Sequence, residues 1–189
     1  MTRIGIILGS TRPGRNGEQV ARWVHDIAAR RTDAEFELVD RADFALPLLD
    51  EPVPASMGQY ADDHAKRWAA TVASLDGFVM VTPEYNHSTS GALKNAIDYL
   101  FAEWNNKAVG FVGYGSVGGA RAVEHLRLIA GEVKMADVRQ QVTLSLAADF
   151  ENYSTFAPGP QHEPLLDVLL GEVVQWSEAL AELRPAMAA

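Results

Sequence analysis

The sequence predicts an α/β protein in which helices cover both faces of a doubly wound, five-stranded parallel sheet. Short apolar runs alternate strictly with segments of helical period along the 189 residues, which is the pattern of parallel strands joined by crossover helices. Three of these runs are apolar at nearly every position, as strands buried on both faces require. No repeat or low-complexity tract divides the chain, so we expect one domain over residues 1–189.

The first half of the chain predicts three strands and two helices. The apolar run RIGIIL indicates a strand at 4–8, and VARWVHDIAA has the period of a helix, which is expected at 17–31. The alternation continues with a strand at 36–40, a helix at 60–74 and a strand at 77–82. Residues 46–57 carry Pro47, Pro52 and Pro54, so this segment is expected to be a loop.

The second half predicts two strands and three helices. Ser90 can cap a helix at 91–104, and strands at 108–114 and 138–146 flank a helix at 119–133. A proline-bearing loop at 157–164 precedes the last helix, 164–183, which carries a broad one-sided apolar stripe. The stripe consists of Leu165, Leu166, Leu169, Leu170, Val173, Val174 and Leu180. The final Ala-Met-Ala-Ala, 186–189, is expected to fray.

The alternation favours the strand order 2-1-3-4-5, which is a flavodoxin-like sheet. In that order, ligands bind beyond the carboxyl ends of the strands, near the point where the strand order reverses. The loops that follow the first, third and fourth strands are therefore the candidate site.

Composition excludes several classes of function. The net charge is −9, whereas binding to nucleic acid or to anionic lipid needs a basic face. The chain has no cysteine, which rules out disulfides, thiolate metal sites and a cysteine nucleophile. No apolar run has the length of a membrane span, and the start of the chain lacks the pattern of a signal peptide. We expect a cytoplasmic protein that contacts neither nucleic acid nor membrane.

The first strand is followed by GSTRPGRNGE, residues 9–18, a turn of the kind that binds phosphate. Gly9 and Gly14 have the spacing of a P-loop, but Arg15 and Asn16 stand where that loop needs Lys and Ser or Thr. The G-x-G-x-x-G motif of dinucleotide sites is also lacking here. A single anion can still bind through hydroxyls, arginines and helix-start amides. The candidate groups are Ser10, Thr11, Arg12, Arg15 and the amides near Gly17.

The second loop follows the third strand and begins with TPEYN, residues 82–86. Tyr85 and Asn86 stand where a flat ligand would lie, and such residues suit a heterocycle with a π face and a polar edge. Glu84 is placed to form a hydrogen bond or an ion pair. An ordinary turn that uses Pro and Asn as turn formers explains the same residues equally well.

The third loop, GYGSVGGARA at 113–122, contains G-x-G-x-x-G between a strand and a helix. That motif normally follows the first strand of its unit. Neither Glu132 nor Asp137 ends an apolar strand, where the acidic residue that binds the ribose is expected. Alternatively, the glycines let the backbone approach a flat ring closely.

Taken together, the three loops resemble the NADPH-dependent FMN reductase family. Its members are small flavodoxin-like flavoenzymes that include quinone, azo-dye and chromate reductases. The resemblance is carried by GSTRPGRNG at 9–17, PEYNHSTSGALKNAIDYL at 83–100 and YGSVGGARA at 114–122, of which the second is the most specific. This chain has Ser90 where the family often has Pro, and Tyr99 where it often has Trp. Both positions flank the pocket and bear on substrate preference more than on flavin binding.

The resemblance implies that the first loop holds the phosphate of FMN and that the other two loops enclose its ring. The implied phosphate-binding residues are Ser10, Arg12, Arg15, Asn16 and Gly17. The implied residues around the ring are Pro83, Glu84, Tyr85 and Asn86 on one side and Tyr114, Gly115, Ser116 and Gly119 on the other.

The resemblance also implies the activity. NADPH or NADH would give a hydride to the flavin, and a quinone, free FMN or a similar flat acceptor would then take the electrons by ping-pong kinetics. The flavin carries the chemistry, so we assign no catalytic side chain. Two alternatives remain: a flavodoxin-like electron carrier without NAD(P)H turnover of its own, and a short dehydrogenase that binds a dinucleotide at the third loop.

Two further features bear on assembly and on metals. Lys94 and Asp98 lie four residues apart, either as an ion pair within one helix or as a pair across a subunit interface. The apolar residues of the expected 91–104 helix exceed one buried stripe, which favours a homodimer or homotetramer. They are Leu93, Ile97, Tyr99, Leu100, Phe101 and Trp104. His87 is expected near the pocket mouth, either in contact with a nicotinamide phosphate or an acceptor or as a solvated loop residue, and the other histidines, including His162, at the surface. None has metal-ligand spacing with another histidine, so no metal site is expected.

Overall fold

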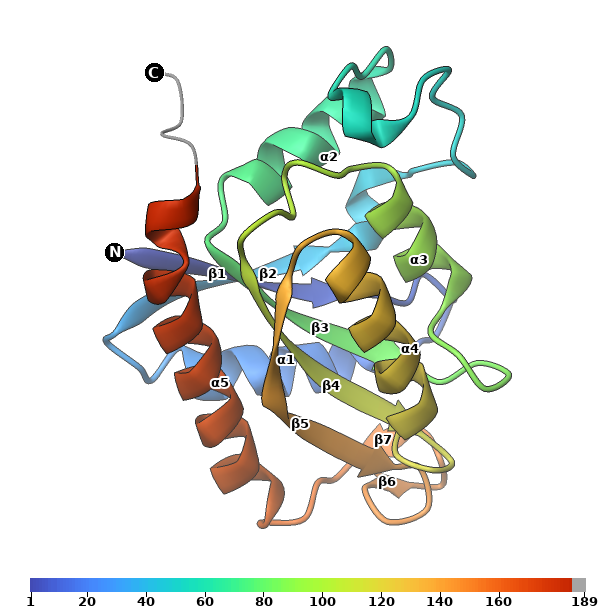
Figure 1. The fold of residues 1–189 in the computed structure, drawn as a ribbon. Coiled ribbons are helices and arrows are strands. Elements are labelled where there is room, and N and C mark those ends of the chain that lie inside the picture. Colours follow the sequence, from blue (N-terminus) through green and yellow to red (C-terminus); the bar gives the residue numbers. More distant parts are fainter. Residues whose placement is uncertain (185–189) are drawn as a thin grey trace.

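The structure is a computed structural model that describes residues 1–184, so the expected fraying at 186–189 lies outside it. Its centre is a five-stranded sheet in the order β2-β1-β3-β4-β5, in which every neighbouring pair is parallel (Figure 1). The predicted class and strand order are therefore confirmed. The strands are β1 (Thr2–Leu8), β2 (Ala34–Asp40), β3 (Gly77–Pro83), β4 (Ala108–Gly115) and β5 (Ala136–Ser145).

Helices cover both faces of the sheet, because its central strands are apolar on both sides. The helices are α1 (Gly17–Ala28), α2 (Asp63–Ala73), α3 (Gly91–Asp98), α4 (Ala120–Glu132) and α5 (His162–Ala179). Side chains of α1 and α5 share one buried cluster with the sheet, and those of α2, α3 and α4 share the other. Short 3-10 helices occur at Arg41–Phe44, Ala55–Met57 and Ala181–Leu183.

Helix α3 is six residues shorter than predicted, since it ends at Asp98 rather than at 104. The chain then turns, and Tyr99 and Trp104 are fully buried. The Trp104 indole N–H donates to the Ile97 carbonyl at 3.1 Å, and its ring packs edge-on against Phe78 with the centroids 5.0 Å apart. The surplus of apolar residues therefore fills the core of this same chain, and the sequence argument for an oligomer based on it was wrong.

The two charged residues of α3 form an ion pair within the helix. Lys94 Nζ lies 2.7 Å from a carboxylate oxygen of Asp98, one helical turn away. The hypothesis that this pair joins two subunits is therefore not needed to explain the two residues.

A short antiparallel hairpin after β5 was not predicted from the sequence. Its strands are β6 (Phe150–Glu151) and β7 (Thr155–Phe156), which lie close to the carboxyl end of β5 (Figure 1). Asn152 and Tyr153 at its turn both have positive φ angles, +49° and +59°. Strands of two residues are too short to show the alternation by which a strand is predicted. Residues 150–156 are called the hairpin wall below.

His162 is buried, contrary to the prediction that it lies at the surface. Its Nε2 lies 2.8 Å from Asp149 Oδ1, and Asp149 also accepts a hydrogen bond from the Ser145 amide at 2.7 Å. These bonds tie the end of β5 to the start of α5, on either side of the hairpin wall. Among residues 1–184, no helix has the length and apolar character needed to cross a membrane.

Candidate functional site

A cavity lies at the carboxyl edge of the sheet, where the loops after β1, β3 and β4 meet. Its lining consists of Arg12, Gly14, Arg15, Asn16, Pro83, Glu84, Tyr85, Tyr114, Gly115, Leu146 and Tyr153. All of these residues except Gly14, Leu146 and Tyr153 were expected from the sequence. The parallel topology explains the meeting, because the three strands end at the same edge of the sheet.

The two arginines of the first loop have different surroundings. Arg15 forms an ion pair with Asp40 at the end of β2 and donates to the Ser10 carbonyl at 2.7 Å. Arg12 is exposed, and no carboxylate within residues 1–184 pairs with it. Arg15 thus holds the loop in shape, whereas Arg12 supplies the positive charge that a ligand anion can use.

The start of α1 faces this loop with free amides. Asn16 occupies the N-cap position, but its side chain makes no capping hydrogen bond; its Nδ2 instead donates to the Tyr153 carbonyl at 2.8 Å. Amides in the first turn of a helix have no partner within the helix and can bind an anion. The backbone of Gly17, the first residue of the helix, lies close to the Tyr114 side chain, because a Cβ on Gly17 would lie 2.5 Å from the Tyr114 hydroxyl.

The Tyr114 hydroxyl is a buried polar group without a hydrogen-bond partner among the described residues. Its burial raises the pKa of the phenol well above the usual value and Tyr85 nearby adds to the rise, while the nearby Ser10 hydroxyl, the Arg15 charge and the Gly17 backbone partly offset it. Leaving a buried hydroxyl unpaired costs about 1–3 kcal/mol. A phosphate held between Arg12 and the start of α1 would accept this bond, so the residues present fit the phosphate end of FMN.

The second loop is fixed at both of its ends. The Ser90 hydroxyl accepts the Leu93 amide at 3.1 Å, which confirms the predicted cap of α3, and donates to the Gly9 carbonyl of the first loop at 2.7 Å. Tyr85 and Ser88 exchange main-chain hydrogen bonds of 2.9 and 3.2 Å. Asn86 therefore lies at the exposed tip of a two-residue turn and not in the lining of the cavity.

Glu84 joins the second loop to the third. Its nearly buried carboxylate forms an ion pair with Arg121 and accepts hydrogen bonds from the Arg121 main-chain amide at 3.1 Å and side-chain Nε at 2.6 Å. The Glu84 amide donates to the Tyr114 carbonyl at 2.9 Å. The sequence prediction that Glu84 forms an ion pair or a hydrogen bond is confirmed, and the pair holds the end of β3 against the start of α4.

The glycines of the third loop serve the turn itself. Gly119 has a φ of +74°, and a Cβ there would lie 2.6 Å from the Tyr114 main-chain nitrogen. A Cβ on Gly118 would lie 2.8 Å from the Thr143 side chain. The dinucleotide-like spacing is thus explained by close packing of the chain against itself. Ser116 is exposed beside this turn, and neither Ser116 nor Gly119 lines the cavity.

The hairpin wall closes one side of the cavity and was not expected from the sequence. Gln19 on α1 donates to the Ser154 carbonyl at 2.8 Å and accepts from the Phe156 amide at 3.0 Å. Tyr153 lies at the turn of the wall, 68% exposed, and lines the cavity. The only local signal is Asn152, a common turn residue, at the start of the turn; strands of two residues add no pattern from which the hairpin could have been predicted.

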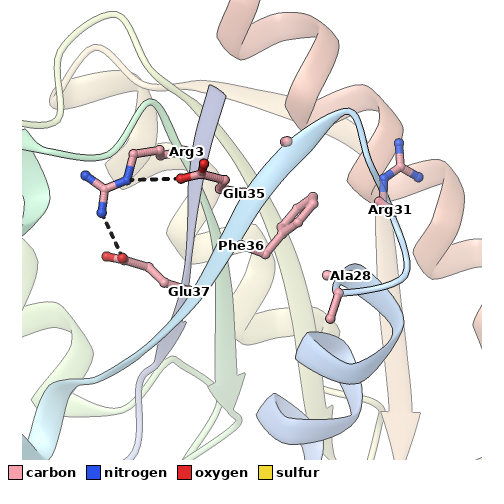
Figure 2. A pocket seen from close by; sticks show the side chains of 8 residues that line it. Arg3, Ala28, Arg31, Glu35, Phe36 and Glu37 are labelled. Atoms are coloured by element: carbon pink, nitrogen blue, oxygen red, sulfur yellow. Dashed lines mark hydrogen bonds and ion pairs between the residues drawn. The ribbon is translucent and has the colours of Figure 1, made fainter. Parts of the chain in front are cut away.

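A second groove lies at the opposite edge of the sheet, where β1 and β2 begin. Figure 2 shows Arg3 reaching toward Glu35 and Glu37, at 3.9 and 2.9 Å. Arg31, at its rim, is paired with Asp33 at 2.5 Å. Its charged groups compensate one another, so this groove presents no free charge to a ligand.

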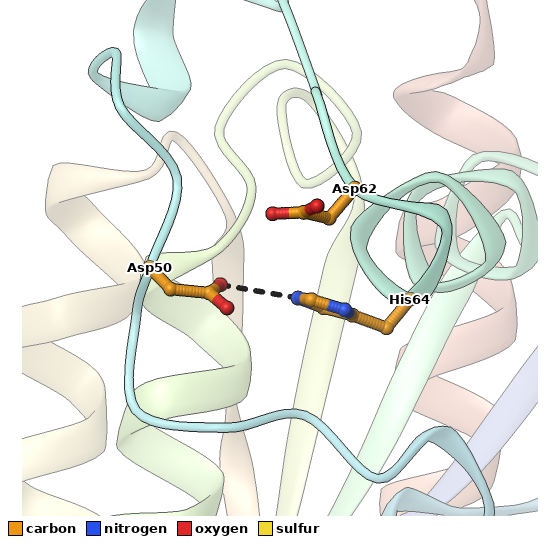
Figure 3. Close-up of side chains that lie close together, drawn as sticks. All are labelled: Asp50, Asp62 and His64. Carbon is orange, nitrogen blue, oxygen red and sulfur yellow. Dashed lines mark hydrogen bonds and ion pairs between the residues drawn. The ribbon is translucent and has the colours of Figure 1, made fainter.

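One cluster of metal-ligand residue types occurs among residues 1–184, although the sequence predicted no metal site. Asp50, Asp62 and His64 offer ligand atoms that lie within 4.8 Å of one another (Figure 3). Asp50 already accepts a hydrogen bond from the Tyr99 hydroxyl at 2.6 Å, and this bond lowers the pKa of its carboxyl. Burial and Asp50 together raise the pKa of Tyr99 to about 12. Hydrogen bonds thus account for the positions of Asp50 and His64, whose Nε2 lies 3.1 Å from Asp50 Oδ1.

Comparison with known proteins agrees with the geometry. The sequence model described as NADPH-dependent FMN reductase matches residues 2–149. An NAD(P)H-dependent FMN reductase of a Nectria species is 41% identical over 191 aligned positions, which cover 95% of this chain and 89% of the relative. A quinone reductase of Escherichia coli strain K12 is 38% identical over 129 positions, or 65% of this chain and 66% of the relative.

A solved structure supports the fold. The flavoenzyme NAD(P)H:(acceptor) oxidoreductase of Paracoccus denitrificans has a TM-score of 0.73 and 21% identity, and the match covers 95% of this chain and 98% of that one. The family match spans most of the chain, and its three loops meet at one cavity that fits the phosphate end of FMN. The chain therefore belongs to the NADPH-dependent FMN reductase family of flavin-dependent oxidoreductases.

Proposed function

We propose that this enzyme uses bound FMN to carry a hydride from NADPH or NADH to a quinone, free flavin or a similar flat acceptor. The observation that carries the proposal is the unpartnered Tyr114 hydroxyl, buried beside the arginine-bearing first loop at one end of the cavity. Membership of the family supplies the two cofactors, and the quinone reductase among the relatives supports the acceptor class.

FMN, when bound, accepts a hydride and releases electrons to the acceptor. The protein's part is binding and orientation. Arg12 and the first-turn amides of α1 would hold the phosphate, with the Tyr114 hydroxyl donating to it. The bond between the Glu84 amide and the Tyr114 carbonyl joins the ends of β3 and β4, and the bond between Glu84 and Arg121 joins the second loop to the start of α4, so the lining on either side of a flat ring is held in place.

The same cavity would serve donor and acceptor in turn. Tyr85 and Tyr153, both partly exposed, line the cavity and would shield a flat molecule from water. Because two flat substrates would use one binding surface, the oxidised dinucleotide has to leave before the acceptor binds. We therefore expect ping-pong kinetics, with parallel lines when reciprocal rates are plotted at several quinone concentrations.

The test is a visible absorption spectrum of the protein with FMN, recorded without oxygen before and after adding NADPH. The proposal expects a protein-bound flavin spectrum that bleaches with NADPH and returns with a quinone. Bound flavin that NADPH does not bleach would overturn it in favour of an electron carrier. A protein that fails to bind FMN would overturn the assignment of the cavity.

We also propose a homodimer or homotetramer, on the resemblance to the family alone. Multi-angle light scattering would give a multiple of the chain mass, and a monomer at micromolar concentration would refute this part.

A further inference from the structure

Three basic side chains gather beside the cavity, on a chain whose net charge is −9. Arg121 lies in the first turn of α4 and His125 one turn later, while His87 comes from the turn between Tyr85 and Ser88. Arg121 Nη1 lies 3.0 Å from His87 Nδ1, and the rings of His87 and His125 are 6.1 Å apart between centroids. These three residues are called the basic triad below.

The contacts leave ring nitrogens of the triad facing solvent. A guanidinium can only donate, so His87 Nδ1 accepts from Arg121 and the ring proton lies on Nε2. His125 is held by its Nδ1, 2.8 Å from the Ser88 hydroxyl. Within residues 1–184 neither Nε2 has a hydrogen-bond partner, and both imidazoles are exposed. The triad thus presents two ring nitrogens as hydrogen-bonding groups for a ligand, beside a guanidinium whose charge Glu84 already compensates.

The backbone holds His87 in a conformation that residues with a side chain rarely adopt. Its φ is +75° and that of Asn86 is +48°, and both values favour glycine. Backbone strain of this kind is concentrated at functional sites, where the surrounding structure enforces it. Here the paired main-chain bonds of Tyr85 and Ser88 enforce it, and the result is that His87 lies against Arg121.

The triad lies between two hollows of the surface. On one side, Glu84 pairs with Arg121 and lines the cavity proposed for the flavin. On the other side, His125 and Ser88 line a groove between α3 and α4, together with Leu128 and Ile129, and Lys94 at its rim. The proposed flavin cavity, the basic triad and the groove with apolar side chains thus lie in this order along the surface. A dinucleotide has its nicotinamide, its phosphates and its adenosine in the matching order.

We propose that His87, Arg121 and His125 bind a phosphate of the dinucleotide donor, and that the groove beyond them takes its adenosine. This inference rests on the proposed function, because it names the binding site of the donor. The 2′-phosphate of NADPH and the diphosphate that NADPH shares with NADH have the same chemistry toward this triad, so the experiment has to separate them.

The first experiment compares donors in the double variant His87→Leu and His125→Leu, which removes both rings without leaving another hydrogen-bond donor and leaves the pair of Glu84 and Arg121 intact. The control is His25→Leu, a partly exposed histidine on α1 that contacts neither hollow. Loss of two hydrogen bonds to a phosphate lowers kcat/KM by about tenfold or more. A loss with NADPH alone assigns the triad to the 2′-phosphate. An equal loss with NADPH and NADH assigns it to the diphosphate. Rates that match the control with both donors overturn the proposal.

A second experiment reads the site without turnover. The imidazole signals of the protein are followed by NMR during titration with adenosine 2′-monophosphate and with adenosine 5′-diphosphate. The signals of His87 and His125 are identified as those missing from the double variant. Saturable shifts of these two signals support the site. If they occur in a protein that shows no reductase activity, only the proposed function is refuted. The absence of a shift with both nucleotides overturns the site, whatever the reductase assay shows.

Discussion

Replacing Tyr114 by Phe should have opposite effects on stability and on FMN binding. The change removes one oxygen, the buried hydroxyl that no described residue satisfies. Without FMN, the variant no longer leaves a desolvated hydroxyl unpaired when it folds. With FMN, the variant lacks the donor that we assign to the phosphate.

The magnitudes follow from the burial of this group. Relief of an unpaired buried hydroxyl should raise the free energy of unfolding of the FMN-free protein by about 1 kcal/mol. A hydrogen bond to a charged group contributes about 1.5–3 kcal/mol. Since 1.4 kcal/mol corresponds to about tenfold in affinity, the dissociation constant for FMN should rise by about 10- to 100-fold.

The assays are urea unfolding of the FMN-free protein and quenching of flavin fluorescence. Tyr99→Phe is the matched control, because this buried hydroxyl is satisfied by Asp50 at 2.6 Å and lies outside the cavity lining. It should lower the free energy of unfolding by about 1 kcal/mol and leave FMN affinity unchanged. If Tyr114→Phe destabilises the protein as Tyr99→Phe does, the hydroxyl is satisfied and the reasoning is wrong. Unchanged FMN affinity would refute the phosphate contact.

Three further predictions follow. Arg12→Ala should weaken FMN binding by about tenfold through loss of a charge-assisted hydrogen bond. The control is Met57→Ala, in the 46–57 loop, and equal FMN affinities of the two variants in a fluorescence titration would contradict the assignment. Gly119→Ala should lower the free energy of unfolding in urea by about 2–4 kcal/mol, because its φ is +74° and a Cβ would lie 2.6 Å from main chain. Gly131→Ala, in open space within α4, the helix that Gly119 precedes, should be neutral or stabilising, and equal losses in the two variants would contradict the argument. Burial lowers the pKa of Lys107 to about 8, so from pH 8 toward 10 the unfolded chain binds more protons and the free energy of unfolding should rise. Lys107→Met should lack this rise. If the free energies of unfolding of the variant and the unchanged protein run parallel with pH, the rise does not come from Lys107.

The sequence was sufficient for the features that depend on local pattern. Strands β1, β3 and β4 are buried on both faces and so leave continuous apolar runs. Parallel topology then places the loops after them at one edge, which is why most of the cavity lining could be predicted. Boundaries were harder, because the apolar pattern of α3 continues past Asp98 although the chain turns there.

The remaining features depend on partners that are distant in the sequence. The spacing of Arg12 and Arg15 does not reveal which arginine is free, since Arg15 is paired with Asp40 at the end of the neighbouring strand. The proline-rich segment before α5 indicated a surface position for His162, but the carboxylate of Asp149 holds this ring in the interior. In both cases the tertiary structure brings in a carboxylate that local pattern does not show.

The hairpin wall has a consequence for the order in which the site is completed during synthesis. The first loop, residues 9–18, is among the first parts of the chain to leave the ribosome, and the strands that carry the other two loops follow. Gln19 acquires its partners on the hairpin only when residues 154–156 have emerged. The three loops are therefore all synthesised before the hairpin wall, and closure of this side of the cavity is among the last events of folding during synthesis. A chain that stopped at residue 149, where the family match ends, would have the loops but not the enclosure.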